Sequence, residues 1–176
     1  PQQEEGLMRG FQLWVNLPAA EKMCAPRYQN IEPEDIPEVH TDDGVRIRVI
    51  AGEVNGVVGA VSGIAVEPTY LDILLPAEAA HRQPIQTGHA ALCYVFEGEV
   101  SIDPSPDGPA VEVPHHTLAV LSDGEAVQLR AGPNGGRALL IAGKPLREPI
   151  VRHGPFVMTT REEIGEAIDD YRAGRF

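Results

Sequence analysis

Short stretches of alternating apolar and polar residues recur along most of this chain. Residues 10–17 alternate with a period of two, and Pro18 ends the pattern; residues 45–50 alternate in the same way. Gly, Pro, Asp and Asn clusters separate further strand-like stretches, at residues 70–75, 90–96, 99–102, 111–113, 117–121, 126–130 and 137–141. Many short strands with this punctuation predict an all-β fold, a barrel or sandwich of jelly-roll type.

The last part of the chain changes period and predicts one C-terminal α-helix over residues 161–173. Thr160 and Glu163 have the spacing of a capping box, in which each side chain binds the other residue's backbone. The apolar residues then follow helical spacing: Ile164, Ala167, Ile168 and Tyr171. Gly174 is expected to end the helix, as glycine often does at a helix C-terminus.

The segment 71–102 organises the predicted barrel. We interpret it as a strand, a turn containing Pro76, a polar loop with His81 and His89, a second strand, a tight turn at Glu97-Gly98, and a third strand. A metal site in a small β-barrel would be built from histidines and a carboxylate in such a segment.

Composition narrows the class of protein. The 176 residues include 18 Gly and 16 Pro, which suits strands joined by tight turns. The net charge of −12 disfavours nucleic acid as a partner, and no apolar stretch is long enough to predict a membrane span. Cys24 and Cys93 are far apart and match no paired-ligand spacing, so we expect free thiols in a reducing cytoplasm.

Four stretches together resemble the pirin family of the cupin superfamily. They are residues 10–29 (GFQLWVNLPAAEKMCAPRYQ), 114–121 (PHHTLAVL), 141–164 (IAGKPLREPIVRHGPFVMTTREEI) and the closing GRF. The resemblance implies two consecutive jelly-roll cupin domains, the first of which carries a non-haem Fe(II) held by three histidines and one glutamate. Some bacterial members oxidise flavonols such as quercetin, and some eukaryotic members act as nuclear transcription cofactors.

The resemblance also predicts how this chain maps onto that plan. In the family pattern the iron ligands precede the stretch that matches residues 10–17, so we expect them upstream of Pro1. Residues 1–29 would then hold a closing strand of a preceding cupin plus a linker, and residues 30–176 the C-terminal cupin domain with its helix. If the strand at 10–17 lacks its barrel, self-association through it is expected.

Counting ligands argues against a metal site within this chain. Metal-binding cupins offer a His-x-His motif, a nearby Glu and a later His, whereas this chain has His81-Arg82-Gln83 and no histidine within 125–130. His81, His89 and Glu97 are therefore interpreted as loop, strand-end and turn residues, with a weak adventitious site as the alternative. We assign no catalytic, cofactor-binding or metal-binding residue here.

The other histidines and the cysteines give weaker signals. His115 and His116 are adjacent, and neighbours on an extended segment point to opposite faces, so they should not share a metal; backbone hydrogen bonds are expected instead. His40 and His153 stand alone and suit surface or interface positions. Cys93 lies in an apolar run and should be a buried, inert thiol, whereas Cys24 is in the linker.

Two function hypotheses from different classes follow. In the first, the chain is the non-metal C-terminal cupin of a pirin-like protein, which packs against an iron-bearing N-terminal cupin and is catalytically inert alone; the full-length protein would resemble an iron-dependent quercetin 2,3-dioxygenase. In the second, it is a protein-interaction or regulatory module that needs no catalysis. A small-ligand pocket inside the barrel is a third alternative.

Overall fold

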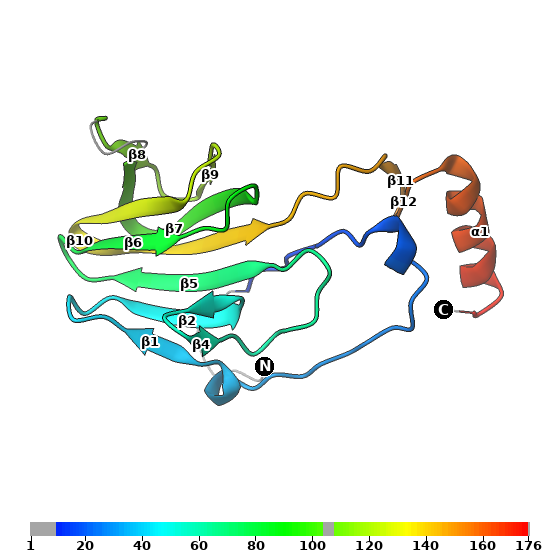
Figure 1. Ribbon diagram of the computed structural model, residues 1–176, viewed down its shortest axis with the longest axis horizontal. Helices are drawn as coiled ribbons and strands as arrows, with labels where there is room; N and C mark the ends of the chain where they lie inside the picture. Colours follow the sequence, from blue (N-terminus) through cyan, green and yellow to red (C-terminus); the bar gives the residue numbers. More distant parts are fainter. Residues whose placement is uncertain (1–9, 104–107, 176) are drawn as a thin grey trace. The chain divides into compact units, whose positions relative to one another are not determined.

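The chain is described by a computed structural model over residues 10–103 and 108–175 (Figure 1). It divides into two compact units. The larger unit is formed by residues 25–146, and the smaller one combines residues from 1–24 with residues from 147–176. The assignment of residues 1–29 and 30–176 to two cupin domains stays a prediction.

The larger unit is almost entirely β-structure. Its strands are β1 (Glu38–His40), β2 (Arg46–Ala51), β3 (Glu53–Val54), β4 (Val57–Val58), β5 (Thr69–Leu75), β6 (Ala80–Pro84), β7 (Ala90–Asp103), β8 (Val111–Val113), β9 (Thr117–Val120) and β10 (Ala126–Gly143). All but β3 and β4, which form a small hairpin, belong to one eight-stranded sheet with antiparallel pairings. A short 3-10 turn, Pro33–Asp35, precedes β1.

Two long strands, β7 and β10, give the sheet its folded form. The first half of β7 pairs with β9 and with the end of β10, which also pairs with β5. The second half of β7 pairs with β8 and with the start of β10, which also pairs with β6. Each long strand therefore passes from one layer into the other, as Figure 1 shows, and the expected all-β jelly roll is confirmed.

The crossing between the layers corrects two sequence predictions. The prediction of a tight turn at Glu97-Gly98 is wrong, because β7 continues through these residues. The prediction of two separate strands in 126–141 is also wrong, because β10 is one continuous strand. The register shifts between Ala131 and Gly136, where four residues of β10 oppose Glu99. Gly98 has a φ of +64° and lies against the backbone of Gly135 and Gly136, so it bends the strand without reversing it.

Alternation within the strands builds the core of the barrel. In β2, the residues at 47, 49 and 51 are buried while their neighbours are less so, as expected for a strand with one face inward. The fully buried side chains of β2, β5, β7 and β10 include Ile47, Val49, Leu71, Ile73, Val95, Leu129 and Leu140, and Val45 just before β2 is buried with them. The polar loop expected around residue 81 is in fact β6, which pairs with the start of β10.

The smaller unit contains a hairpin and the single α-helix of the described chain. Its elements are a 3-10 turn (Ala19–Glu21), β11 (Val151–His153), β12 (Phe156–Met158) and α1 (Arg161–Arg172). The predicted capping box is confirmed, because Thr160 Oγ1 accepts from Glu163 N at 3.2 Å and Thr160 N donates to Glu163 Oε2 at 2.9 Å. The apolar stripe of α1 packs on the hairpin through Met158, Ile164 and Ala167.

The strand expected at residues 10–17 does not form in this structure. No strand pairing among the described residues includes this segment, and a strand needs a neighbour for its backbone groups. Its side chains Trp14 and Val15 are 63% and 43% exposed. The idea that its neighbour belongs to a preceding domain stays a prediction. None of the helices in the described ranges is long and apolar enough to cross a membrane.

Candidate functional site

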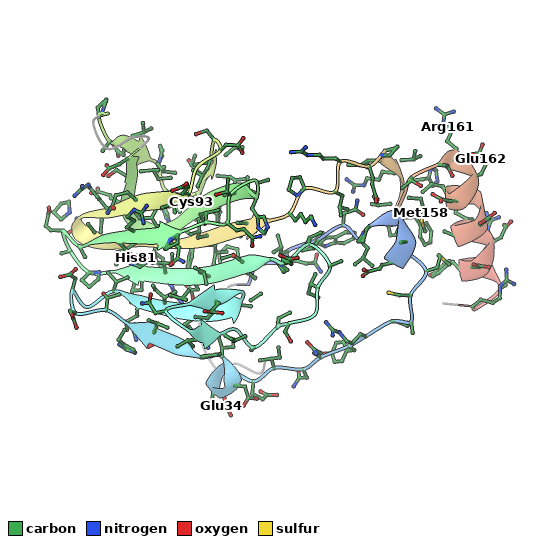
Figure 2. The ribbon with its side chains drawn as sticks, in the orientation of Figure 1. Glu34, His81, Cys93, Met158, Arg161 and Glu162 are labelled. Carbon is green, nitrogen blue, oxygen red and sulfur yellow. The ribbon has the colours of Figure 1, made fainter. Side chains whose placement is uncertain are left out.

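The three residues considered as metal ligands, His81, His89 and Glu97, lie in different surroundings. Figure 2 shows His81 on β6, where its side chain is half-buried. His81 Nε2 lies 3.1 Å from Gln83 Oε1, so the imidazole already has a side-chain neighbour. Gln83, which is buried, donates from Nε2 to the carbonyl oxygen of Pro84 at 3.2 Å. The polar groups of β6 therefore satisfy one another locally.

His89 is buried immediately before β7, and a tight turn fixes its position. Its backbone N–H donates to the carbonyl oxygen of Gln86 at 3.1 Å, and Gly88 adopts a φ of +84° between them. A positive φ at the third position of a β-turn favours glycine. The turn ends the connection from β6 and leads directly into the barrel strand.

The imidazole of His89 is buried and has no hydrogen-bond partner within residues 10–103 and 108–175. The residue is 8% exposed, and neither Nδ1 nor Nε2 makes a hydrogen bond to the part of the chain that the structure describes. Leaving a buried polar group unpaired costs roughly 1–3 kcal/mol, and buried polar groups in folded proteins are nearly always paired. His89 is therefore the polar group in the barrel that calls for a further explanation.

His89 lines a cavity of about 270 Å³ at one end of the barrel. Strands β7, β8 and β9 and the start of β10 supply most of the wall, which is largely apolar: Ile85, Ala91, Ile102, Val113, Ala119, Leu121 and Val127. Ser122 and Asp123 lie on the exposed side, in the β9–β10 connection. The cavity thus has an apolar interior, one buried imidazole and a polar rim.

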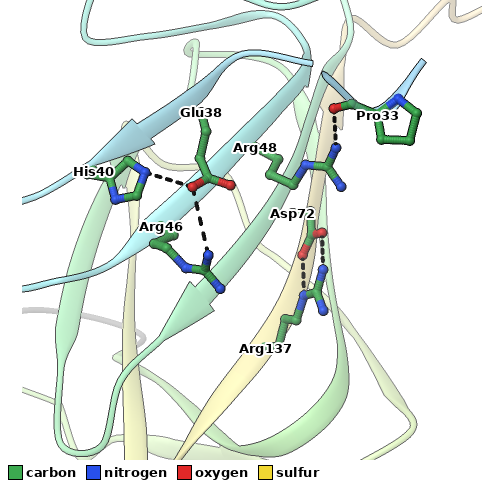
Figure 3. Close-up of polar contacts among 7 residues, drawn as sticks. All are labelled: Pro33, Glu38, His40, Arg46, Arg48, Asp72 and Arg137. Atoms are coloured by element: carbon green, nitrogen blue, oxygen red, sulfur yellow. Dashed lines mark hydrogen bonds and ion pairs between the residues drawn. The ribbon is translucent and has the colours of Figure 1, made fainter. Parts of the chain in front are cut away.

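Glu97 lies on β7, where it belongs to a charged cluster. Arg137 on β10 donates two hydrogen bonds to Asp72 on β5, at 2.8 and 2.6 Å (Figure 3). Arg137 Nη1 is also 3.8 Å from Glu97 Oε1, and the guanidinium lies 5.2 Å from the centroid of the Phe96 ring. Glu97 thus balances the charge of an arginine.

The cluster also shifts two titrations. The hydrogen bond to Asp72 raises the pKa of the Arg137 guanidinium above its ordinary value. Burial raises the pKa of the nearby Tyr70 hydroxyl, and the charge of Asp72 adds to this effect. Arg137 therefore stays positively charged and Tyr70 stays neutral to higher pH, so the pairing of Arg137 with Asp72 is maintained.

The residues described here do not fit an iron centre. No three His, Cys, Asp or Glu side chains within 10–103 and 108–175 gather closely enough to hold a metal. His81 contacts Gln83, Glu97 faces Arg137, and only His89 of the three lines the cavity. Non-haem iron sites need several such ligands converging on one point, so we derive no reaction step through a metal in this chain.

His115 and His116 correct a prediction of geometry. Their rings do not point to opposite faces; they stack with centroids 3.8 Å apart and planes 26° from parallel. The reason is that His116 has a φ of +62°, so the segment is not extended at this point. The expected backbone contact is present, because His115 Nε2 lies 2.6 Å from the carbonyl oxygen of Phe96.

The remaining single candidates occupy structural or exposed positions. His40 Nε2 is 2.7 Å from Glu38 Oε1 on β1 (Figure 3), and His153 is exposed on β11. Cys24 is exposed and Cys93 is buried; burial raises the pKa of the Cys93 thiol to about 11. The prediction that Cys93 is a buried thiol is confirmed.

The sequence reasoning did not locate two features: an ion pair and the cavity, although a pocket inside the barrel was one alternative. The pairing of Asp72 with Arg137 depends on the register of β5 and β10, which are 65 residues apart at this contact. The cavity beside His89 depends on strands that a local pattern cannot place together. The available signal was the dipeptide Gly88-His89 before an apolar strand, which marks a turn and puts a histidine at a barrel end.

Comparisons with known proteins agree with this architecture. The sequence profile of the pirin C-terminal cupin domain matches residues 70–176. Pirin from Mus musculus is 50% identical over 165 residues, which are 93% of this chain and 55% of the mouse protein. A pirin-like protein from Caulobacter vibrioides is 42% identical over 182 residues, with 100% of this chain and 62% of that protein covered.

A solved structure shows the same fold over nearly the whole chain. The crystal structure of quercetin 2,3-dioxygenase from Acinetobacter baumannii superposes with a TM-score of 0.81 and 38% identity. The match covers 93% of this chain and 55% of that one. The chain thus spans a little over half the length of these relatives. Fold, motifs and profile agree: this chain belongs to the pirin family, and residues 70–176 match its C-terminal cupin domain.

Proposed function

We propose that this chain is the C-terminal, non-metal cupin of a protein with two consecutive cupins. Its role is to pack against an N-terminal cupin and form one wall of that domain's cleft. The observation that carries the proposal is the profile match over 70–176, together with the separate surroundings of His81, His89 and Glu97. Relatives roughly 1.6 to 1.8 times as long as the matched segment support it, since the match covers 62% and 55% of them.

The outward face of one sheet layer offers a surface for such packing. Leu118 and Val120 on β9 are 50% and 77% exposed, whereas Ala119 between them packs against the barrel core. Successive strand residues alternate between faces, so apolar side chains also lie on the outer side. An apolar outer face is what a domain contact requires.

The full-length protein would be an iron-dependent flavonol 2,3-dioxygenase. The name of the Acinetobacter baumannii relative supports this activity, and the family resemblance supports an Fe(II) held by three histidines and one glutamate of the N-terminal cupin. The chain alone is then catalytically inert, since its own residues supply no converging ligand set among those described.

The test compares this chain with a longer protein in which an iron-bearing N-terminal cupin precedes it. Both are purified without added metal, and iron content and quercetin consumption under oxygen are measured. We expect stoichiometric iron and turnover only in the longer protein. Stoichiometric iron and quercetin turnover by the 176-residue chain alone would contradict the proposal.

A second candidate is a protein-interaction module without catalysis. Large apolar side chains of the segment before β1 are well exposed, among them Trp14 at 63%, Met23 at 65% and Tyr28 at 89%, and exposed apolar groups in one segment suit a protein contact. Alanine replacement of Trp14 and Tyr28 should then abolish self-association or capture of a partner, as followed by light scattering. Full-length protein that lacks quercetin turnover but keeps such an interaction would favour this candidate over the first.

A further inference from the structure

The smaller unit has too little buried apolar surface to be stable by itself. Its core within the described ranges is small, and its buried residues are Met158, Ile164 and Ala167. A two-stranded hairpin is marginally stable in water, and a 12-residue helix such as α1 draws most of its stability from tertiary packing. The smaller unit therefore needs a further surface to pack against.

Hydrogen bonds tie the N-terminal part of the smaller unit to its C-terminal hairpin. Lys22 Nζ donates to Asn16 Oδ1 at 2.7 Å and to the carbonyl oxygen of Val157 at 2.9 Å. Ala19 N donates to Glu148 Oε2 at 2.8 Å. Figure 1 shows the 3-10 turn of the N-terminal part next to β11 and β12. Two segments far apart in the sequence thus form one body.

The N-terminal part presents apolar side chains on an unpaired backbone. Leu13, Trp14 and Val15 are 37%, 63% and 43% exposed. The backbone N–H and C=O groups of residues 12–17 form no hydrogen bond to the part of the chain that the structure describes. Unpaired backbone groups on an apolar segment are a template for pairing with another strand.

A groove of about 460 Å³ lies between the N-terminal part and the hairpin of this unit. Apolar side chains from both parts line it, namely Trp14, Val15, Leu17, Val157 and Met158. Lys22 and Arg152 also line it, whereas no acidic residue does among the described lining residues. A partner that fits this groove brings an apolar side chain with an Asp or Glu beside it, because charges at an interface are complementary.

The lengths of the relatives indicate which partner this is. The match covers 55% of the mouse protein and 62% of the Caulobacter vibrioides protein, so each has enough additional chain for one more domain. The barrel of this chain, in contrast, forms a separate compact unit. A second copy of this chain would bring the same cations to the groove and the same net charge of −12, so repulsion disfavours it.

We infer that the smaller unit, including α1, docks onto the preceding cupin domain of the same protein. Residues 12–17 add a strand to an open sheet edge of that domain, and the hairpin and α1 pack over the same edge. Main-chain hydrogen bonds then provide affinity, and the groove selects the side chains of the edge strand. The helix thus stabilises the neighbouring domain rather than its own barrel. The inference rests on the proposed function, because it requires a preceding cupin.

The experiment compares hydrogen–deuterium exchange in the 176-residue chain and in the longer protein in which an N-terminal cupin precedes it. Exchange at backbone amides is followed by mass spectrometry. We expect the amides of residues 12–17 and of α1 to exchange at least about tenfold more slowly in the longer protein, because docking suppresses local opening. The amides of β2 and β5, which are paired within the barrel of this chain, should change much less.

Two pairs of variants of the longer protein test the contacts. Lys22→Met removes the two hydrogen bonds that hold the hairpin and should speed exchange in α1 about tenfold. Lys144→Met is the matched control, because this exposed lysine lies in the larger unit. Trp14→Ala removes a wall of the groove and should speed exchange in both parts, whereas Tyr28→Ala removes an exposed aromatic outside the smaller unit and should change neither. Thermal unfolding confirms that each variant folds.

The outcomes are decisive in both directions. Slower exchange of residues 12–17 and α1 in the longer protein, reversed by Trp14→Ala but not by Tyr28→Ala, supports the inference. Equal exchange of α1 in the two proteins would overturn it, because the helix would then need no preceding domain. Exchange that slows as the concentration of the 176-residue chain rises would also overturn it, because the occupant would then be a second copy.

Iron content and quercetin turnover separate this inference from the proposed function. Slower exchange in a longer protein that lacks turnover contradicts the dioxygenase proposal and leaves the docking inference supported. Turnover in a longer protein whose α1 exchanges as quickly as in this chain overturns the docking inference alone.

Discussion

Two polar sites along β7 differ in how the protein satisfies them. At the middle of the strand, Glu97 joins a cluster in which Arg137 forms two hydrogen bonds to Asp72. Just before the strand begins, His89 is buried beside a cavity with both ring nitrogens unpaired. The first site contains its own partners and stabilises the sheet, whereas the second has no hydrogen-bond partner among the described residues. The two sites therefore differ in their hydrogen-bond partners.

The largest expected effect is at Gly98, beside the charged cluster. A Cβ added there would lie 2.9 Å from the carbonyl carbon of Gly135 and from Gly136 Cα, and the residue has a positive φ. Gly98→Ala should therefore lower the free energy of unfolding by about 3 kcal/mol, through backbone strain and crowding. Urea denaturation followed by circular dichroism measures the change.

Gly88 is the matched control at the other site, just before His89. It also has a positive φ, +84°, but an added Cβ would meet nothing within 4 Å. Gly88→Ala should cost only about 1 kcal/mol, from strain alone. Equal losses for the two variants would show that close approach of β7 to β10 does not matter at the bend.

The next effect concerns the charged cluster itself. Asp72→Ala removes the carboxylate that accepts two hydrogen bonds from Arg137, whose side chain is 31% exposed. We expect a loss of about 1–3 kcal/mol in the free energy of unfolding, because a partly buried guanidinium is left without its main partner. Chemical denaturation again gives the measurement.

Asp103→Ala provides the comparison for that variant. Asp103 also accepts from an arginine, but Arg130 is 54% exposed, and exposed ion pairs contribute about 0–1 kcal/mol. The Asp72 variant should thus lose more stability than the Asp103 variant. A larger stability loss in the Asp103 variant would mean that the Asp72 cluster contributes no more than an exposed ion pair.

Replacing His89 should raise the free energy of unfolding, whereas the substitutions above lower it. His89→Phe removes two unpaired buried nitrogens and keeps an aromatic ring, and the adjoining cavity leaves room for it. We expect the free energy of unfolding to rise by about 1 kcal/mol. A more stable variant would show that the unpaired imidazole costs the native fold stability. A clear loss of stability would instead mean that His89 has a structural role.

Sequence patterns predicted the elements better than the sites. Alternation located β2, β5, β8 and β9 closely, and the capping residues Thr160 and Glu163 marked the helix start, because these signals are local. The bend at Gly98 was predicted as a turn because a glycine after a charged residue has the same local signal whether the chain reverses or bends. Only the long partner strand β10 decides between them.

The sites were harder to predict for the same reason. Ligand counting predicted that His81, His89 and Glu97 form no metal site, and this stays a prediction. The stacking of His115 on His116 required a positive φ at a residue that rarely adopts one. Likewise, whether His89 meets a filled core or a cavity depends on side chains from strands distant in sequence.

The last prediction concerns the reactivity of the Cys93 thiol, which lies on β7 between His89 and Glu97 in the sequence (Figure 2). Its effect on stability is the smallest of those considered. Burial raises the pKa of its thiol from 9.0 to about 11, so at pH 8 its thiolate fraction is about a hundredfold lower than that of an unperturbed thiol. Cys24, which is exposed, should therefore react quickly with a chromogenic disulfide reagent, and Cys93 only after urea unfolds the chain. Because a raised pKa favours the protonated folded state, this contribution to stability is complete below pH 9 and is lost as the pH rises toward 11. Two thiols that react at equal rates in the native protein would show that this part of β7 opens to solvent.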